Sequence, residues 1–252
     1  MSRVIRRILA VLAAAVLAAG VVCAAADADA PGLEEFPVRF GDRNSKKIAI
    51  TMDDVNEPEW VWKTLDLCEQ YGITMTVFPI GINLHEEDRE NWQRLLDDGC
   101  EIGSHTYWHD AIMDISAWDI LYTLGMFQQR LDEVLGYHYE VRWFRPPYGS
   151  VADSNGSMYA NMRTIKLFGY QHILNWDVSY MWDAKITLEQ TKNGSILLFH
   201  ARELDYICIA DLIPMLLEAG YEPVTVSELF GFDPPETSEE LYVYDPKQFM
   251  QQ

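Results

Sequence analysis

Short apolar segments alternate with segments of helical spacing along most of this 252-residue chain. Apolar residues recur three and four positions apart in the helical segments, and Gly72, Gly99, Gly136 and Gly169 follow four of them directly. This alternation is typical of βα units around a parallel sheet, so we expect a single-domain α/β fold. The expected strands are 47–52, 74–79, 100–104, 143–144, 172–177, 196–199 and 223–226, and the expected helices are 60–71, 87–98, 116–135, 157–168 and 209–219.

The first expected strand ends in two adjacent carboxylates, Asp53 and Asp54. In parallel α/β folds the carboxyl ends of the strands form the rim where the chemistry is placed, so we expect both side chains at that rim. Taken alone, paired Asp residues after a strand are also common as turn or helix-cap residues. Their meaning therefore depends on what else reaches the same rim.

Two histidines four positions apart, His105 and His109, follow the third expected strand. A pair of this kind is often only a satisfied surface or core pair. With one of the two Asp residues, however, it makes a metal face of two nitrogens and one carboxylate that leaves positions open for water and substrate. The other Asp would then be free to take a proton from that water. The combination predicts a metal-dependent hydrolase.

Two later segments place further polar groups beside rigid or apolar structure. One is Arg145-Pro146-Pro147-Tyr148-Gly149, and the other is the apolar run 196–199, which ends at His200. By themselves, Arg145 could be a surface ion-pair residue, Tyr148 part of a turn, and His200 a core histidine. Their order after the two metal-type segments favours a role in the same site.

Taken together, these segments resemble the polysaccharide deacetylase family, also known as carbohydrate esterase family four. The resemblance runs from about residue 46 to about residue 231 and implies one catalytic domain over that range. The implied fold is an irregular (β/α) barrel with the motifs at its carboxyl-terminal rim. The matching segments are Thr51-Met52-Asp53-Asp54, His105 to His109, Arg145 to Tyr148, Leu198-Phe199-His200, and 220–229 as the closing strand.

The resemblance assigns roles to the main residues. Asp54, His105 and His109 would hold a divalent cation, zinc in the first place and Co²⁺ or another divalent ion as the alternative. Such a cation polarises an amide carbonyl and acidifies water. Asp53 would act as general base, and His200 would protonate the leaving amine.

Five further positions would complete the implied site. Arg145 would keep the general base, Asp53, charged and oriented. Pro147 and Tyr148 would lie at the substrate, where the backbone N–H of Tyr148 would face the oxyanion together with the metal. Trp176 and Leu198 would form a small apolar slot for the acetyl methyl group, although Trp176 suits core packing equally well.

The chain departs from the family pattern at two places. Val55 stands where the family has Gly, and because a β-branched residue disfavours positive φ, we expect the turn there to be built differently. The fourth motif is altered over 176–183. Asp177, Asp183 or neither would then hold Arg145, and we favour Asp183 because the family's partner belongs to the loop. The segment 183–193 is short for a crossover helix, so we expect the barrel to be trimmed there.

The amino terminus resembles a secretory signal peptide. Arg3, Arg6 and Arg7 precede the apolar run 8–22, and small residues follow over 23–28. We expect a signal peptide over 1–30, with an uncleaved membrane anchor as the alternative, and a lead-in over 31–45. The predicted location is therefore extracellular or in the cell envelope.

Charge and cysteine content narrow the partners. The formal net charge is −20 and no basic stripe is present, which argues against nucleic acid as a partner. Residues 232–252 are expected to form an acidic tail. Outside the signal-like segment the cysteines are Cys68, Cys100 and Cys208, an odd number that excludes a full disulfide framework.

Three hypotheses for the function follow. The first is an exported metal-dependent hydrolase that removes N-acetyl groups from an amino-sugar polymer such as peptidoglycan or a chitin-like glycan. The second keeps the fold and the metal but acts on a small amide. The third is a noncatalytic carbohydrate-binding relic, motivated by Val55 and the altered fourth motif; the retained ligands, together with Asp53 and His200, argue against it.

Overall fold

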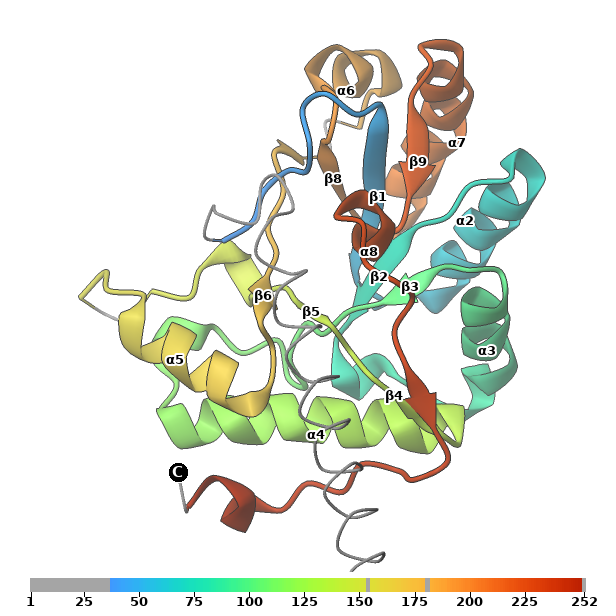
Figure 1. The fold of residues 1–252 in the computed structure, drawn as a ribbon. Helices are drawn as coiled ribbons and strands as arrows, with labels where there is room; N and C mark the ends of the chain where they lie inside the picture. Colours follow the sequence, from blue (N-terminus) through green and yellow to red (C-terminus); the bar gives the residue numbers. More distant parts are fainter. Residues whose placement is uncertain (1–36, 153–154, 180–181, 251–252) are drawn as a thin grey trace, which may run out of the picture.

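The computed structural model describes residues 37–152, 155–179 and 182–250 (Figure 1). Its centre is a parallel sheet in which β1 (Lys47–Asp54) lies between β2 (Thr76–Pro79) and β8 (Ile196–His200). The sheet continues outward through β3 (Glu101–Ile102) next to β2 and β7 (Val178–Ser179) next to β8. β9 (Glu222–Val224) pairs with the first residues of β1, on a stretch that β2 does not reach.

The remaining strands close the sheet into an irregular barrel. β5 (Trp143–Phe144) and β6 (His172–Ile173) pair in parallel, and a single bridge between Ser104 and Phe144 joins β5 to the segment after β3. The segment 172–179 connects this pair to the central sheet, because its first strand, β6, pairs with β5 and its second strand, β7, pairs with β8. The expected irregular (β/α) barrel in one domain is thus confirmed.

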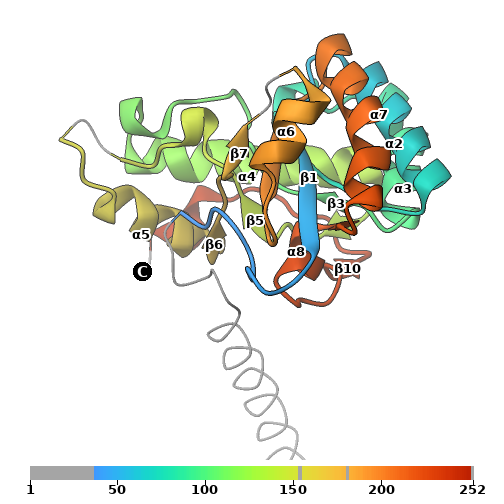
Figure 2. The same ribbon diagram turned by 90° about the horizontal axis from the view of Figure 1, so that it is seen from above.

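Helices surround the sheet in the spatial order α6, α7, α2, α3, α4 and α5 (Figures 1 and 2). Their ends follow local sequence signals: Pro58 occupies the first turn of α2, Ser116 and Asp119 form a capping box at α4, and Gly72 and Gly136 end these two helices with positive φ. The bounds are α2 (Pro58–Tyr71), α3 (Arg89–Asp97), α4 (Ala117–Leu135), α5 (Tyr159–Phe168), α6 (Ala184–Gln190), α7 (Glu203–Glu218) and α8 (Val226–Leu229).

Two helices differ from the expectation. The segment 183–193 contains α6, a helix of 7 residues whose amino-terminal cap is Asp183, so a helix forms where none was expected, although it is as short as the segment length implied. α7 begins at Glu203 rather than near residue 209. Its first turns carry Leu204 and Ile207 on the exposed face, at 56% and 49% exposure. Apolar residues that face solvent disturb the periodicity from which the start of a helix is predicted.

Segments outside the expected range 46–231 also belong to the packed structure. Before β1, Gly41 donates its N–H to the carbonyl of Gly194 at 2.7 Å. After α8, β10 (Thr237–Ser238) pairs antiparallel with β4 (His138–Tyr139), and the chain continues along α4 (Figure 1). The acidic segment 232–252 is therefore anchored over its described part, while its Glu side chains remain exposed.

The expected signal peptide over 1–30 lies outside the described residues. Within the described ranges, no helix is long and apolar enough to cross a bilayer.

Cys68, Cys100 and Cys208 are buried and free. They behave as small apolar side chains of the core.

Candidate active site

The two carboxylates of the first motif stand at the carboxyl end of β1, in a strained turn. Asp54 and Val55 both have positive φ, at 70° and 59°, and the N–H of Val55 donates to the carbonyl of Asp53 at 2.9 Å. Val55 is buried in the core. The expectation that Val55 would avoid positive φ is wrong, because burial and the surrounding hydrogen bonds hold it in a conformation that a β-branched residue rarely adopts.

The two histidines of the second motif face Asp54. Nδ1 of His105 lies 2.8 Å from the carbonyl oxygen of Arg145. Since a carbonyl only accepts, Nδ1 carries the proton and Nε2 is left for a ligand. The Nε2 atoms of His105 and His109 both lie 3.4 Å from Oδ1 of Asp54. The expected ligand set is thus brought together on one side of the barrel rim.

These three residues fit a divalent cation. Their ligand atoms all lie within 4.8 Å of one another. Oδ1 of Asp54 is buried and has no hydrogen-bond partner in the described structure. A buried carboxylate oxygen normally accepts a hydrogen bond. One that has no hydrogen-bond donor and lies between two imidazole nitrogens has the surroundings expected of a metal ligand.

The electrostatic surroundings favour the ionisation states that a metal site needs. Burial opposes ionisation of Asp54, but His105, His200 and His109 outweigh it and lower the pKa of Asp54 below its ordinary 3.8. Burial lowers the pKa of His109, with His105 adding to the shift. Burial also lowers the pKa of His200, against the opposing charges of Asp53 and Asp54. An ionised Asp54 and a neutral His109 are the forms that bind metal.

Arg145 is completely buried and holds the second carboxylate. Its Nη1 donates to Oδ1 of Asp53 at 2.6 Å and to the hydroxyl of Thr51 at 2.8 Å, and its Nη2 donates to the carbonyl of Asn175 at 3.2 Å. The other oxygen of Asp53, Oδ2, lies 3.9 Å from Nε2 of His105. One carboxylate oxygen is therefore fixed by Arg145 while the other faces the metal-type cluster.

The two carboxylates expected to hold Arg145 are used elsewhere. Asp177 pairs with Arg43 at 2.7 Å and accepts from the hydroxyl of Ser195 at 3.0 Å. Asp183 accepts from two backbone N–H groups of the first turn of α6. The favoured partner Asp183 is therefore wrong, and of the alternatives considered, Asp177, Asp183 or neither, the structure shows neither. The guanidinium is held by the expected Asp53 and also lies over the ring of Phe78, with its central carbon 4.2 Å from the ring centre.

Thr51 and Asn175 were not predicted as partners of Arg145. Thr51 lies two residues before Asp53 on β1, so both side chains point to the same face, and that spacing was available in the sequence. Asn175 acts through its backbone carbonyl, which every residue type offers. Its role carried no sequence signal.

A cavity of about 700 Å³ opens above the cluster. His200 reaches it from the end of β8, with Nε2 4.0 Å from Oδ2 of Asp54. Trp176 and Leu198 line it as expected, whereas Pro146 lines it and the expected Pro147 does not. The described residues that line it are Asp53, Asp54, His105, His109, Pro146, Tyr148, Trp176, Ser179, Leu198 and His200.

Tyr148 stands at the mouth of this cavity. Its φ is 61°, its side chain is 73% exposed, and its ring packs edge-on against His109 with centroids 4.8 Å apart. Trp108, between the two ligand histidines in sequence, is 51% exposed. Tyr148 therefore offers an exposed aromatic surface next to the polar cluster.

Comparison with known proteins places this arrangement in a family. The polysaccharide deacetylase family profile matches residues 40–164. The chain is 31% identical over 193 residues to a bifunctional xylanase/deacetylase of Pseudobutyrivibrio xylanivorans, with 75% of this chain and 31% of that protein covered. It is 30% identical over 210 residues to a peptidoglycan-N-acetylglucosamine deacetylase of Bacillus cereus, with 75% of this chain and 90% of that protein covered.

A solved structure supports the same fold. A mutant of BA3943, described as a family-four pseudoenzyme with restored enzymatic activity, superposes with a TM-score of 0.67 at 23% identity. The match covers 79% of this chain and 72% of that one. Together with the motifs at the barrel rim, these likenesses show that the chain belongs to the polysaccharide deacetylase family, carbohydrate esterase family four, a family of hydrolases.

Proposed function

We propose that this protein is an exported, metal-dependent hydrolase that removes N-acetyl groups from an amino-sugar polymer, peptidoglycan or a chitin-like glycan. The observation that carries the proposal is the buried, unpartnered Oδ1 of Asp54 between His105 and His109, beside an Asp53 held by Arg145. A structural cluster would pair that oxygen with a donor.

The donor set suits zinc first, with Co²⁺ or another divalent cation as the alternative, since two imidazoles and one carboxylate are a common catalytic zinc set. Asp54, His105 and His109 would hold the ion. When bound, a divalent cation supplies a Lewis acid that polarises the amide carbonyl and makes nearby water more acidic.

The protein's own residues supply the proton transfers. Asp53 takes the proton of the attacking water through Oδ2, while the ion pair of Oδ1 with Arg145 fixes the rotation of the carboxylate. His200, across the cavity, gives a proton from its imidazolium form to the nitrogen as the C–N bond breaks. The proton taken up by Asp53 then passes to solvent, and His200 regains its proton from solvent. Trp176 and Leu198 take the acetyl methyl group, and the backbone N–H of Tyr148 is the proposed donor to the carbonyl oxygen.

A polymer substrate is favoured over a small amide by the surface around the cavity. Tyr148 is exposed beside the ligand histidine His109, and flat aromatic faces suit the apolar faces of sugar rings. The Bacillus cereus relative, named for action on peptidoglycan, is covered over nine-tenths of its length. Export to the cell envelope, where such a polymer lies, is proposed from the signal-like sequence over 1–30.

The test is acetate release by the purified protein from N-acetylated chito-oligomers and from peptidoglycan glycan strands. We expect release to stop after chelation and to return when Zn²⁺ or Co²⁺ is added. Release that survives complete metal removal would refute the metal-dependent assignment. Bound metal without any release would support the noncatalytic alternative, and release from a small N-acetyl amide alone would support the small-molecule alternative.

A further inference from the structure

A three-residue turn lies between the two loops that carry the metal-type residues. This turn, η1 (Gly81–Asn83), directly follows β2 and Ile80. The N–H groups of Gly81 and Ile82 donate to the carbonyls of Thr106 and Tyr107 at 2.9 and 3.0 Å. These two acceptors lie between the ligand histidines in sequence, so η1 is bonded to the histidine loop at two consecutive residues.

The same turn is bonded to the loop that carries Asp54. The side-chain amide of Asn83 donates to the carbonyl of Asp54 at 2.9 Å and to Oδ1 of Asn56 at 3.0 Å. The N–H of Ile80, just before the turn, donates to the same Asp54 carbonyl at 3.1 Å. The backbone of a proposed metal ligand thus receives two hydrogen bonds from this one region.

Both loops are held in conformations that are sparsely populated. Asp54 and Val55 have φ of 70° and 59° on one side, and Thr106 and His109 have φ of 65° and 64° on the other. None is glycine, so each conformation is unfavourable by itself and persists only where the surroundings fix it. The hydrogen bonds of η1 end on Asp54 and Thr106, two of these residues, and on the adjoining Tyr107.

Position 81 also requires glycine, because the turn packs closely against Tyr107 there. A Cβ atom at this position would lie 2.5 Å from Cδ2 and 3.0 Å from Cα of Tyr107. Glycine is therefore needed for the approach of the two backbones rather than for its φ. The residue after the turn is bonded to α4, because Nε of Arg130 donates to the carbonyl of the buried Leu84 at 2.8 Å.

We propose that η1 is a clamp which holds the Asp54 loop and the His105–His109 loop at the separation that metal binding needs, and that Asn83 and Gly81 are positioning residues of the site. The inference rests on the proposed metal site. Neither residue touches the ligand side chains themselves. They act through the backbone of Asp54 and of Thr106 and Tyr107.

The test is the affinity of the full chain for Zn²⁺ and Co²⁺ alone, measured by titration calorimetry after metal removal. Asn83→Ala removes both side-chain bonds, and Asn83→Asp keeps the shape but not the donor. Gly81→Ala inserts a methyl group against Tyr107. We expect each to weaken metal binding by about 10- to 100-fold, the usual effect of losing an outer partner of a metal ligand.

Two matched variants separate positioning from general destabilisation. Asn56→Ala leaves the bond from Asn83 to Asp54 in place and should keep the affinity within a few-fold of the wild type. Asn161→Ala removes a buried amide that donates to the carbonyls of Val151 and Ile112 at 3.1 and 3.4 Å, outside both loops. It should lower the thermal unfolding temperature without changing metal affinity.

A third comparison tests the strain directly. Val55→Gly removes the steric cost of positive φ, so the loop no longer depends as strongly on the clamp. We expect Asn83→Ala to weaken metal binding less in the Val55→Gly background than in the wild type. An equal loss in both backgrounds would contradict the link between the clamp and the strained turn.

The outcomes distinguish this inference from the proposed function. A wild-type protein that binds neither metal overturns the metal site and the clamp together. A wild type that binds metal, with unchanged affinity in Asn83→Ala and Gly81→Ala, overturns the clamp alone. An equal loss of affinity in Asn161→Ala would also overturn it, because the effect would then follow stability rather than loop position.

Discussion

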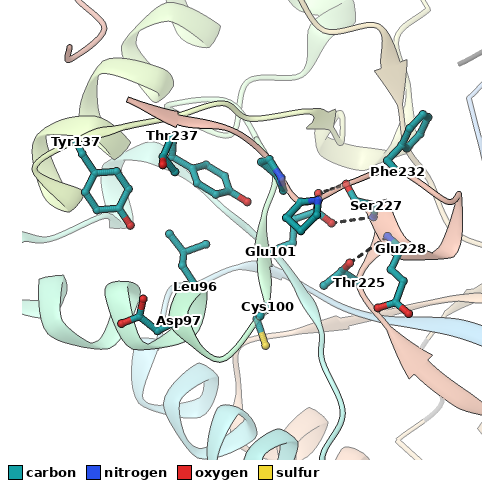
Figure 3. A pocket seen from close by; sticks show the side chains of 14 residues that line it. Leu96, Asp97, Cys100, Glu101, Tyr137, Thr225, Ser227, Glu228, Phe232 and Thr237 are labelled. Carbon is teal, nitrogen blue, oxygen red and sulfur yellow. Dashed lines mark hydrogen bonds between the residues drawn. The ribbon is translucent and has the colours of Figure 1, made fainter. Parts of the chain in front are cut away.

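Two cavities of similar size lie at opposite ends of the barrel and differ in how their polar groups are satisfied. The cavity at the carboxyl ends of the strands measures about 700 Å³ and contains Asp53 and Asp54. The other, at the amino end of β3, measures about 650 Å³ and contains Glu101 (Figure 3). Both hold a buried carboxylate, so neither volume nor buried charge tells them apart.

At the amino end, the carboxylate is fully bonded. Glu101 accepts from the N–H of Ser227 at 2.9 Å and from the hydroxyl of Ser227 (Figure 3). It also accepts from the hydroxyl of Thr76 at 3.2 Å. None of the side chains that line this cavity in the described structure has a buried polar atom without a partner. The network joins β2, β3 and α8, and we interpret it as structural.

At the carboxyl end, one carboxylate oxygen is left for a ligand. Among the described residues Oδ1 of Asp54 has no hydrogen-bond donor, and positive φ recurs at Asp54, Thr106, His109 and Tyr148. Strained backbone and unpartnered polar atoms persist where function requires them. In this protein they mark the reactive end of the barrel more clearly than cavity volume does.

The largest expected effect is at a metal ligand. His105→Ala should lower metal affinity by more than the ~100-fold seen for outer partners and should abolish hydrolysis, because two ligands hold a cation poorly. Metal content and acetate release measure it. A His105→Ala protein that keeps stoichiometric metal would show that the unpartnered oxygen of Asp54 has another purpose.

The next effect separates the two adjacent carboxylates. Asp53→Asn should retain metal yet lose about 10²- to 10⁴-fold in kcat, since an amide cannot accept the proton of the attacking water. The measurement is kcat together with metal content in the same preparation. Loss of metal in this variant would instead make Asp53 a ligand and remove the general base from the scheme.

A smaller effect is expected at the structural end. Ser227→Ala removes a hydroxyl that donates to Glu101 and accepts from Nε1 of Trp143 at 3.0 Å. Leaving these buried groups unsatisfied should lower the free energy of unfolding by about 1–3 kcal/mol, as measured in urea. Metal affinity should stay at the wild-type value; a parallel loss of metal binding would mean that the two ends are coupled.

The smallest effect concerns pH. Burial raises the pKa of Glu101 above its ordinary 4.5, against the hydrogen bonds of Ser227. The folded state then keeps a proton that the unfolded state releases, so the free energy of unfolding falls as the pH rises from 4.5 toward the raised value. Glu101→Gln should flatten this fall in urea unfolding at a series of pH values. An unchanged slope would assign the pH dependence to other groups.

The alternating pattern predicted most of the fold because strands and helices of this barrel follow local spacing. The strand expected over 47–52 is observed as Lys47–Asp54, and the helix expected over 116–135 is observed as Ala117–Leu135, with Ser116 as its cap. The start of α7 was missed because its first apolar residues face solvent. Local pattern predicts an element best when its apolar face is the buried one.

The candidate metal ligands could be proposed from sequence because the carboxyl ends of parallel strands lie at one rim of the barrel. Residues at or just after the ends of β1, β3, β5 and β8 therefore lie close together, even where the loop conformations are not predicted. The bonds of Arg145 other than the one to Asp53 could not be proposed in this way. Whether Asp177, Asp183 or neither also holds the guanidinium depends on how the segment 172–179 crosses from β5 to β8, which is a long-range arrangement.

The sequence by itself determined the chemical groups, their order along the chain and the end of the barrel at which they gather. Only the tertiary structure decided the rest: the positive φ of Val55, the bonds of Arg145 to Thr51 and Asn175, and the contact of η1 with both ligand loops. The physical reason is that each of these depends on packing between segments distant in sequence, which can hold a residue in a conformation that its own side chain disfavours.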